Sequence, residues 1–134
     1  MSYTNISKQI IEVLKTVNGL NAVYEHNEKN SEKFPYAIVL PESHDDTFND
    51  TSSNVRSFTF NIFIIATTTD AQDSERIMRV LVDDVISKLE GNVKLNNSCD
   101  YSMPSSGRWG YSVDRNPPIR YCNITLTARK RVVR

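Results

Sequence analysis

Apolar residues recur at helical spacing near the start of the chain. One face of the segment 4–18 carries Ile6, Ile10, Val13, Leu14 and Val17, at intervals of i, i+4, i+7, i+8 and i+11. Residues at these intervals share a face of an α-helix, so the pattern predicts an amphipathic helix over residues 4–18. Gly19 follows, in the position where a helix commonly ends in a left-handed residue.

Two strands are predicted after this helix, over residues 21–26 and 34–40, with the polar run 27–33 connecting them. Pro35 and Pro41 bracket the second strand. A proline cannot donate a hydrogen bond to a sheet ladder, so it is confined to the ends and edges of strands.

A longer strand begins near Val55, where the residues alternate between two faces. One face carries Phe58, Phe60, Ile62 and Ile64 and is the predicted core face. The opposite face begins polar and becomes apolar only at Phe63 and Ile65. We therefore expect one end of the strand to be covered on both faces. Its polar end, residues 56–61, is expected to lie beside the acidic segment 42–53.

A second amphipathic helix is predicted between Asp70 and Gly91. Its apolar stripe consists of Ile77, Met78, Leu81, Val82, Val85, Ile86 and Leu89. Thr69 or Asp70 can cap its first turn, and acidic residues there stabilise the positive end of the helix dipole.

The remaining segments have weaker patterns. Residues 42–53 are predicted to form a polar loop or an extended hairpin arm, and residues 93–95 a short strand. Residues 99–118, rich in Ser, Gly, Pro and aromatic side chains, are predicted to be a long irregular loop. A last strand is predicted over residues 119–128, followed by a basic tail at residues 129–134.

Together these elements predict a single α+β domain over residues 1–134, in the order α-β-β-β-α-β-β. Two helices are expected to pack on a mostly antiparallel sheet of four or more strands, giving two layers. The composition, 39% hydrophobic and 24% charged over 134 residues, is typical of one globular domain. No apolar run approaches the roughly 20 residues of a membrane helix. The first residues lack a secretory signal pattern, so an intracellular site of assembly is expected.

Candidate catalytic chemistry is sparse in this sequence. The histidines are His26 and His44, no Gly-x-Ser-x-Gly motif is present, and the four glycines do not form a phosphate-binding loop. His44, Asp45 and Asp46 have metal-ligand chemistry, but consecutive residues seldom all reach one ion. We therefore predict no enzymatic activity, no metal and no cofactor.

The two cysteines are Cys99 and Cys122. Cys122 falls in a strand pattern, which favours a small buried free thiol. A disulfide between the two is the disfavoured alternative, because no secretory signal is predicted. Neither cysteine has a second Cys or His at zinc-ligand spacing.

The net charge is zero, but the charges are unevenly distributed. Residues 101–134 contain seven basic residues and one acidic residue, a net charge of +6, and residues 1–100 contain nine basic and fifteen acidic residues, a net charge of −6. This division is typical either of a solvated surface that has no functional role or of a subunit one face of which contacts the opposite face of its neighbour. Trp109, beside Arg108 and Tyr111, can stack on nucleic-acid bases, anchor a partner protein or close one end of the core.

The order of the elements resembles that of the tail terminator and tail-completion proteins of long-tailed bacteriophages. The resemblance rests on the N-terminal helix, the strand Phe-Pro-Tyr-Ala-Ile-Val-Leu-Pro, and the long strand from Arg56 that runs into a helix near Asp70. An acidic excursion separates these two strands, and a closing strand spans residues 120–129. In layout the resemblance covers nearly the whole chain.

The resemblance implies a virion structural protein that forms a ring, typically a hexamer, which caps the tail tube and joins it to the head connector. The implied partners are further copies of the chain, the tail tube protein and the connector or neck proteins. Assembly would take place in the host cytoplasm, without a membrane or specific nucleic-acid binding, and the genome would pass through the ring. The segments 42–53 and 101–118 would be arms that contact neighbours, and the uneven charge would suit head-to-tail contacts.

Two other functions fit the same sequence. One is a head–tail adaptor or stopper protein of the phage neck, and the other is a small intracellular module that binds a protein. In each case the candidate contact residues are charged or aromatic and lie outside the predicted core. They are Glu42, Asp45, Asp46, Asp50, Arg56, Arg108, Trp109, Tyr111, Arg115, Arg129, Lys130 and Arg131.

Overall fold

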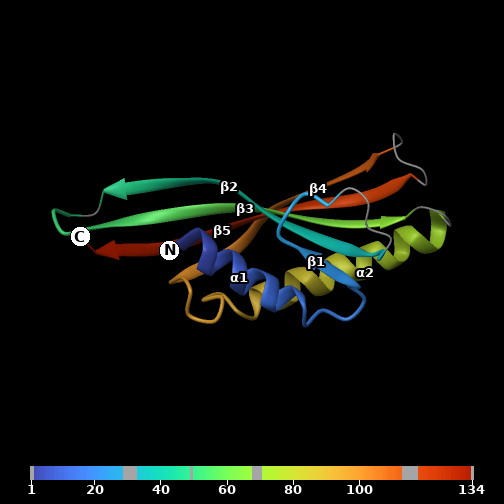
Figure 1. Cartoon of the computed structure of the whole chain (residues 1–134), viewed down its shortest axis with the longest axis horizontal. Coiled ribbons are helices and arrows are strands. Elements are labelled where there is room, and N and C mark those ends of the chain that lie inside the picture. Colours follow the sequence, from blue (N-terminus) through green and yellow to red (C-terminus); the bar gives the residue numbers. More distant parts are fainter. Residues whose placement is uncertain (1, 29–32, 49, 68–70, 113–117, 134) are drawn as a thin grey trace.

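The computed structural model describes residues 2–28, 33–48, 50–67, 71–112 and 118–133. Its elements are α1 (Ser2–Leu14), β1 (Ala22–Tyr24), β2 (Tyr36–Phe48), β3 (Ser53–Thr67), α2 (Ala71–Glu90), β4 (Tyr101–Ser112) and β5 (Ile119–Val133). The predicted order α-β-β-β-α-β-β and the α+β class, with two helices packed on one sheet, are both confirmed (Figure 1).

The five strands form one sheet in the order β1-β2-β3-β5-β4. Four of them pair antiparallel, whereas β1 is parallel to β2 and pairs only with residues 36–38. β3 is central and pairs with β5 along its whole length, from Ser53 opposite Val133 to Thr67 opposite Ile119. Both helices pack on one face of the sheet, α1 beside β2 and α2 beside β4 (Figure 1).

The core lies between the helices and the face of β3 that alternation predicts to be apolar. The core-facing residues of β3 are Phe58, Phe60, Ile62 and Ile64, and all four are buried. They join apolar residues of both helices in one cluster, among them Ile6, Ile10, Leu14, Met78, Val85 and Leu89. α1 ends earlier than predicted, at Leu14, and turns lead on to Gly19, whose φ of 103° is the expected left-handed conformation.

A smaller apolar cluster lies on the opposite face of the sheet. Tyr36, Ile38, Ile65 and Ile119 are buried there, and Phe63 packs against them. This confirms the expectation that one end of β3 is covered on both faces.

Residues 42–48 belong to a strand, so the long loop predicted at residues 42–53 is wrong and the alternative, a hairpin arm, is correct. β2 continues to Phe48 and pairs with β3 as far as Asn54. The side chains of residues 41–48 are exposed on both faces, so no apolar alternation marks this strand in the sequence. Its backbone is held by cross-strand hydrogen bonds instead.

β4 occupies most of the segment 99–118 that was predicted to be irregular, and this prediction is also wrong. Tyr101–Ser112 pairs with β5 at the edge of the sheet, with most side chains exposed, so again no burial pattern appears in the sequence. The strand predicted at residues 93–95 is a turn region instead, in which buried Leu95 has a φ of 45°.

The basic tail predicted at residues 129–134 is, as far as the structure describes it, the end of a strand. Residues 129–133 belong to β5 and pair with residues 53–57 of β3. Together with residues 43–48 of β2 they form a three-stranded arm that extends beyond the helices, on the left in Figure 1. We call residues 43–48, 53–58 and 128–133 the arm.

The core assignment predicts a large loss of stability for Phe60→Ala. Removal of a fully buried phenylalanine costs about 3–5 kcal/mol in the free energy of unfolding, because a cavity remains. Thr59→Ala, on the opposite face of the same strand, is expected to change that free energy by less than about 1 kcal/mol. Urea unfolding followed by circular dichroism measures both, and equal losses would contradict the assigned core face.

Candidate interaction surfaces

An ion pair joins β2 to β3 within the arm. Arg56 Nε donates to Asp46 Oδ1 at 2.6 Å, and Arg56 Nη2 donates to Asp46 Oδ2 at 3.3 Å. Asn54 Nδ2 donates to the same Oδ1 at 2.9 Å. The two charged residues are direct cross-strand partners, and the hydrogen bond to Asp46 raises the pKa of Arg56. The polar end of β3 therefore lies beside the acidic segment, as predicted, and the pair supports the register of the hairpin.

Asp50 organises the backbone between β2 and β3. Its Oδ1 accepts hydrogen bonds from the backbone N–H groups of Ser52 and Ser53, both at 2.8 Å, and from their hydroxyls at 2.9 and 3.2 Å. These bonds, chiefly the one from the Ser52 N–H, lower the pKa of Asp50 from 3.8 to about 2. The Asp50 carboxylate thus stabilises the connection between β2 and β3.

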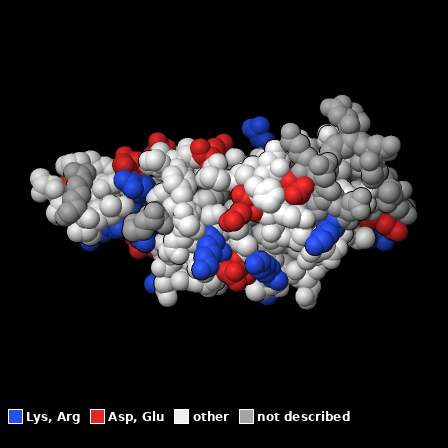
Figure 2. Space-filling model, in the orientation of Figure 1, with Lys and Arg blue, Asp and Glu red and all other residues white. Residues whose placement is uncertain are grey.

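The acidic and basic candidates of the arm lie on different strands. Glu42, Asp45 and Asp46 belong to β2, while Arg129, Lys130 and Arg131 belong to β5, with β3 between them. Figure 2 shows acidic side chains gathered along the edge that β2 forms. Lys130 Nζ lies 3.4 Å from the Ser98 carbonyl oxygen, whereas Arg129 and Arg131 are exposed. The arm therefore presents an acidic margin and, two strands away, a basic one.

A second surface, at the other end of the sheet, is built around Arg120. The Arg120 guanidinium carbon lies 4.9 Å from the ring centroid of Trp109 and 4.3 Å from that of Tyr111. Arg120 Nε donates to Glu75 Oε2 at 2.9 Å and Arg120 Nη2 donates to Glu75 Oε1 at 3.0 Å, which lowers the pKa of Glu75. The guanidinium thus contacts two aromatic rings while α2 holds it in place.

Trp109 and Tyr111 are 41% and 60% exposed, so the alternative in which Trp109 closes the core is wrong. Sequence reasoning missed Arg120 and Glu75. The alternation of β5 places Arg120 on the same face as Cys122, but only the packing of α2 brings Glu75 to it. A bidentate arginine held by a carboxylate keeps both rings oriented before any partner arrives.

Eleven of the twelve candidate contact residues therefore fall into two groups. The arm contains or adjoins Glu42, Asp45, Asp46, Asp50, Arg56, Arg129, Lys130 and Arg131. Arg108, Trp109 and Tyr111 lie on β4 toward the far end of the sheet, opposite residues 120–123 of β5. Arg115 lies outside the described residues.

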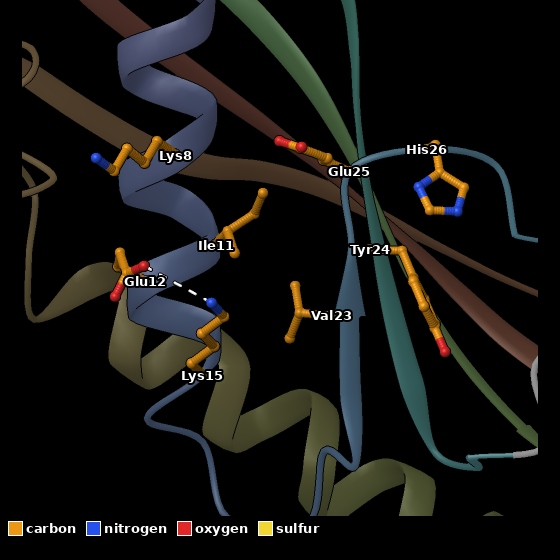
Figure 3. Close-up of a pocket in the computed structure, with 8 residues that line it drawn as sticks. All are labelled: Lys8, Ile11, Glu12, Lys15, Val23, Tyr24, Glu25 and His26. Carbon is orange, nitrogen blue, oxygen red and sulfur yellow. Dashed lines mark ion pairs between the residues drawn. The ribbon is translucent and has the colours of Figure 1, made fainter.

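A groove of about 370 Å³ runs between α1 and β1 (Figure 3). Ile11 and Val23 face each other across it, and an ion pair at 3.7 Å joins Lys15 to Glu12 at its margin. Its walls carry charges of both signs from exposed side chains, so the groove resembles ordinary solvated surface.

Cys99 and Cys122 are both free thiols and buried, as the strand pattern favoured for Cys122. Burial raises the pKa of both thiols. Among the residues that the structure describes, no three His, Cys, Asp or Glu side chains gather into a group able to hold a metal ion. In that same part of the chain, no helix combines the length and the apolar character needed to cross a membrane.

Comparison of the sequence with models of protein families and with curated proteins finds no match. The function is therefore argued from the arm, from the aromatic surface of β4, and from the layout of the fold.

The hydrogen bonds of Asp50 predict a pH-dependent contribution to stability. The folded pKa lies below the ordinary value, so the ionised carboxylate stabilises the fold above pH 3.8, and this contribution is lost as the pH falls toward about 2. Asp50→Asn should therefore unfold at lower urea than the unmodified protein at neutral pH, and the difference should shrink through that interval. A difference that does not vary with pH would contradict the role assigned to the carboxylate.

The contacts of Arg120 predict a spectroscopic change, because Trp109 is the single tryptophan of the chain. Arg120→Ala removes the group that orients its ring, so acrylamide should quench Trp109 fluorescence more strongly than in the unmodified protein. Arg79→Ala is the matched control, since Arg79 also contacts Glu75, at 3.4 Å. Similar quenching in Arg120→Ala and the unmodified protein would show that Arg120 does not hold the ring.

Proposed function

We propose that this protein is a ring-forming structural subunit of a phage tail: a terminator that caps the tail tube and joins it to the head connector. The observation that carries the proposal is the sheet, which extends past its helices as a polar arm and leaves β4 and residues 39–48 of β2 at open margins. A subunit of this shape presents its neighbours with long strand surfaces at both sides.

The layout of the elements supports the same function. The α+β order on which the family resemblance rests is present in the structure, including the strand from residue 36 and the long β3 followed by α2. The resemblance implies that the segments 42–53 and 101–118 are arms. In the structure, residues 42–48 form the end of β2, and residues 101–112 form β4. Both are largely exposed and both are available to a neighbouring subunit.

The distribution of charge also favours contacts between unlike surfaces. The acidic margin on β2 and the basic residues on β5 lie at different positions on one subunit, so a neighbour in a closed ring can bring one against the other. A contact between identical surfaces would place acids against acids. In this proposal the protein works in the virion, at the junction of tail and neck.

The exposed aromatic residues of β4 favour a second candidate function. β4 is an edge strand that itself carries the exposed Trp109 and Tyr111. Such an edge can pair with an extended peptide of another protein as a further strand, which is how several small binding modules work. A module of this kind would act as a monomer or a dimer, so formation of a hexamer-sized ring separates the two functions.

Native mass spectrometry of the unmodified protein, alone and mixed with a tail tube protein, tests the proposed function. The chain has a mass of 15.3 kDa, and the expected result is a discrete oligomer of hexamer size, or such an oligomer formed only on the tube. Negative-stain images should show rings. A protein that stays monomeric at high concentration and does not bind the tail tube protein would overturn the proposal. Binding to connector protein alone would favour an adaptor or stopper.

A further inference from the structure

The sheet ends in two long edges, β4 and residues 39–48 of β2, and each of them pairs with a strand on one side only among the described residues. β4 has one neighbour, β5, along its whole length. β2 is paired with β1 only through residues 36–38, so residues 39–48 have β3 alone as a neighbour. An edge of this kind presents a row of N–H and C=O groups that can pair with another strand.

We propose that residues 39–48 of β2 in one copy pair antiparallel with β4 of the next copy, so that the sheet continues from subunit to subunit. This inference rests on the proposed ring function and assigns the surfaces through which the ring closes. The occupant of each edge is therefore a second copy of this chain.

The direction of the strands makes this pairing geometrically consistent. β2 runs antiparallel to β3, β3 to β5, and β5 to β4, so β2 and β4 point in opposite directions. A copy placed in the same orientation beside β4 therefore presents its β2 antiparallel, and the helices of both copies lie on the same side of the shared sheet. Because two unlike edges meet, the contact repeats head to tail and can close into a ring.

Charge distinguishes this pairing from the contact of two β2 edges. Glu42, Asp45 and Asp46 lie on β2, and all three residues are exposed. Two β2 edges side by side would bring these acids together, which is unfavourable across paired strands. β4 itself has no acidic residue, and beside its first residue, Tyr101, the exposed Arg129 of β5 follows in the same cross-strand row. Asp100 directly precedes β4 and accepts a hydrogen bond from the Arg131 N–H, so the favourable charge contact is the one between Asp45 of a neighbour and Arg129.

The register of the sheet indicates which residues meet. Four residues form one cross-strand row in each subunit, in the order Ser43, Thr59, Thr127 and Met103. A neighbour placed without a shift thus brings its Ser43 opposite Met103. Asp45 then lies opposite Tyr101, and Tyr101 lies opposite Arg129 on its other side. The backbones at Asp45 and Arg129 are therefore two strand spacings, about 10 Å, apart, and the long Arg129 side chain can bridge most of that distance.

The same register places the two edge prolines together. Within one subunit, Pro41 pairs with Phe60 across the strands, Phe60 pairs with Leu126, and Leu126 pairs with Pro104. Each proline removes one backbone donor, and prolines within sheets are tolerated at edges for this reason. A register shift lies beside each proline, between Pro41 and Ser43 on β2 and between Pro104 and Ser106 on β4, so the regular part of the proposed ladder begins at Ser43 opposite Met103 and runs toward Asp45.

Cysteine cross-linking between two separately purified variants tests this pairing. Ser43→Cys is mixed with Met103→Cys, Tyr101→Cys or Ser106→Cys, which cover the unshifted register and small shifts from it, and a short bis-maleimide is added. We expect a covalent product of twice the 15.3 kDa mass that contains one chain of each kind. A chain carrying both Ser43→Cys and Met103→Cys should give a series of covalent oligomers that ends at the ring.

The chain offers matched controls. The native thiols Cys99 and Cys122 are 5% and 1% exposed, so the unmodified protein should not react. Ser87→Cys places an exposed thiol on α2, in a hollow lined also by Glu12 and Val13 of α1, and should not link to Ser43→Cys. Each single variant alone should stay at the mass of one chain.

A charge exchange tests the same contact independently. Asp45→Arg alone and Arg129→Asp alone should each shift the oligomer toward monomer in native mass spectrometry, because each places like charges near one another across the contact. The double variant should recover the oligomer, since the attraction is restored with its sign reversed. A double variant that assembles worse than either single variant would contradict the contact.

Native mass spectrometry on the cross-linking samples separates failure of this inference from failure of the proposed function. An oligomer whose β4 variants do not link to Ser43→Cys, or in which Ser43→Cys links to itself, overturns the strand pairing and leaves the ring function standing. A strict monomer, alone and with tail tube protein, overturns both.

Discussion

Hydrogen bonding of β3 to a neighbour on each side is the constraint on which the rest of the structure depends. One face of β3 is buried under both helices, so a slip of one residue would move Phe58 and Phe60 out of the core. The core therefore determines the register of β3 against β2 and β5. In the arm, helix α1 reaches only the base, where Tyr3 contacts His44 and Phe58. The register of the rest of the arm follows from that ladder and from the pair of Asp46 with Arg56.

The two ends of the sheet use different means to hold exposed side chains in place. In the arm, Arg56 is held by a carboxylate directly across the strand pair, and Asp50 fixes the backbone through its serine neighbours. At the end of β4, a carboxylate from α2 holds Arg120 against two exposed rings. In both places the side chains are ordered in a single copy. A partner would then lose less conformational entropy on binding, which suits the proposed role in assembly.

The sequence predicted the buried elements well and the exposed ones poorly. Alternation along β3 identified its core face because one side is apolar, and the stripe of α2 identified that helix for the same reason. The end of β2 and nearly all of β4 are exposed on both faces, so the residue pattern leaves a loop and a hairpin arm both open for the first and predicts an irregular loop for the second. Of the candidate contacts, the pair of Asp46 with Arg56 could be anticipated as proximity of segments. The contact of Glu75 with Arg120 could not, because 45 positions separate the two residues.

By itself the sequence determined the elements that bury apolar surface, their order, and the absence of a long apolar span, because burial leaves a periodic trace in the residues. It also carried the uneven charge and the order of elements on which the proposal of a phage tail terminator rests. Only the tertiary structure decided that β2 and β5 lengthen into an arm, that β4 forms an edge, and that acids and bases lie on separate strands of one sheet. The physical reason is that these features depend on backbone pairing between distant segments, and backbone hydrogen bonds leave no mark on the order of side chains.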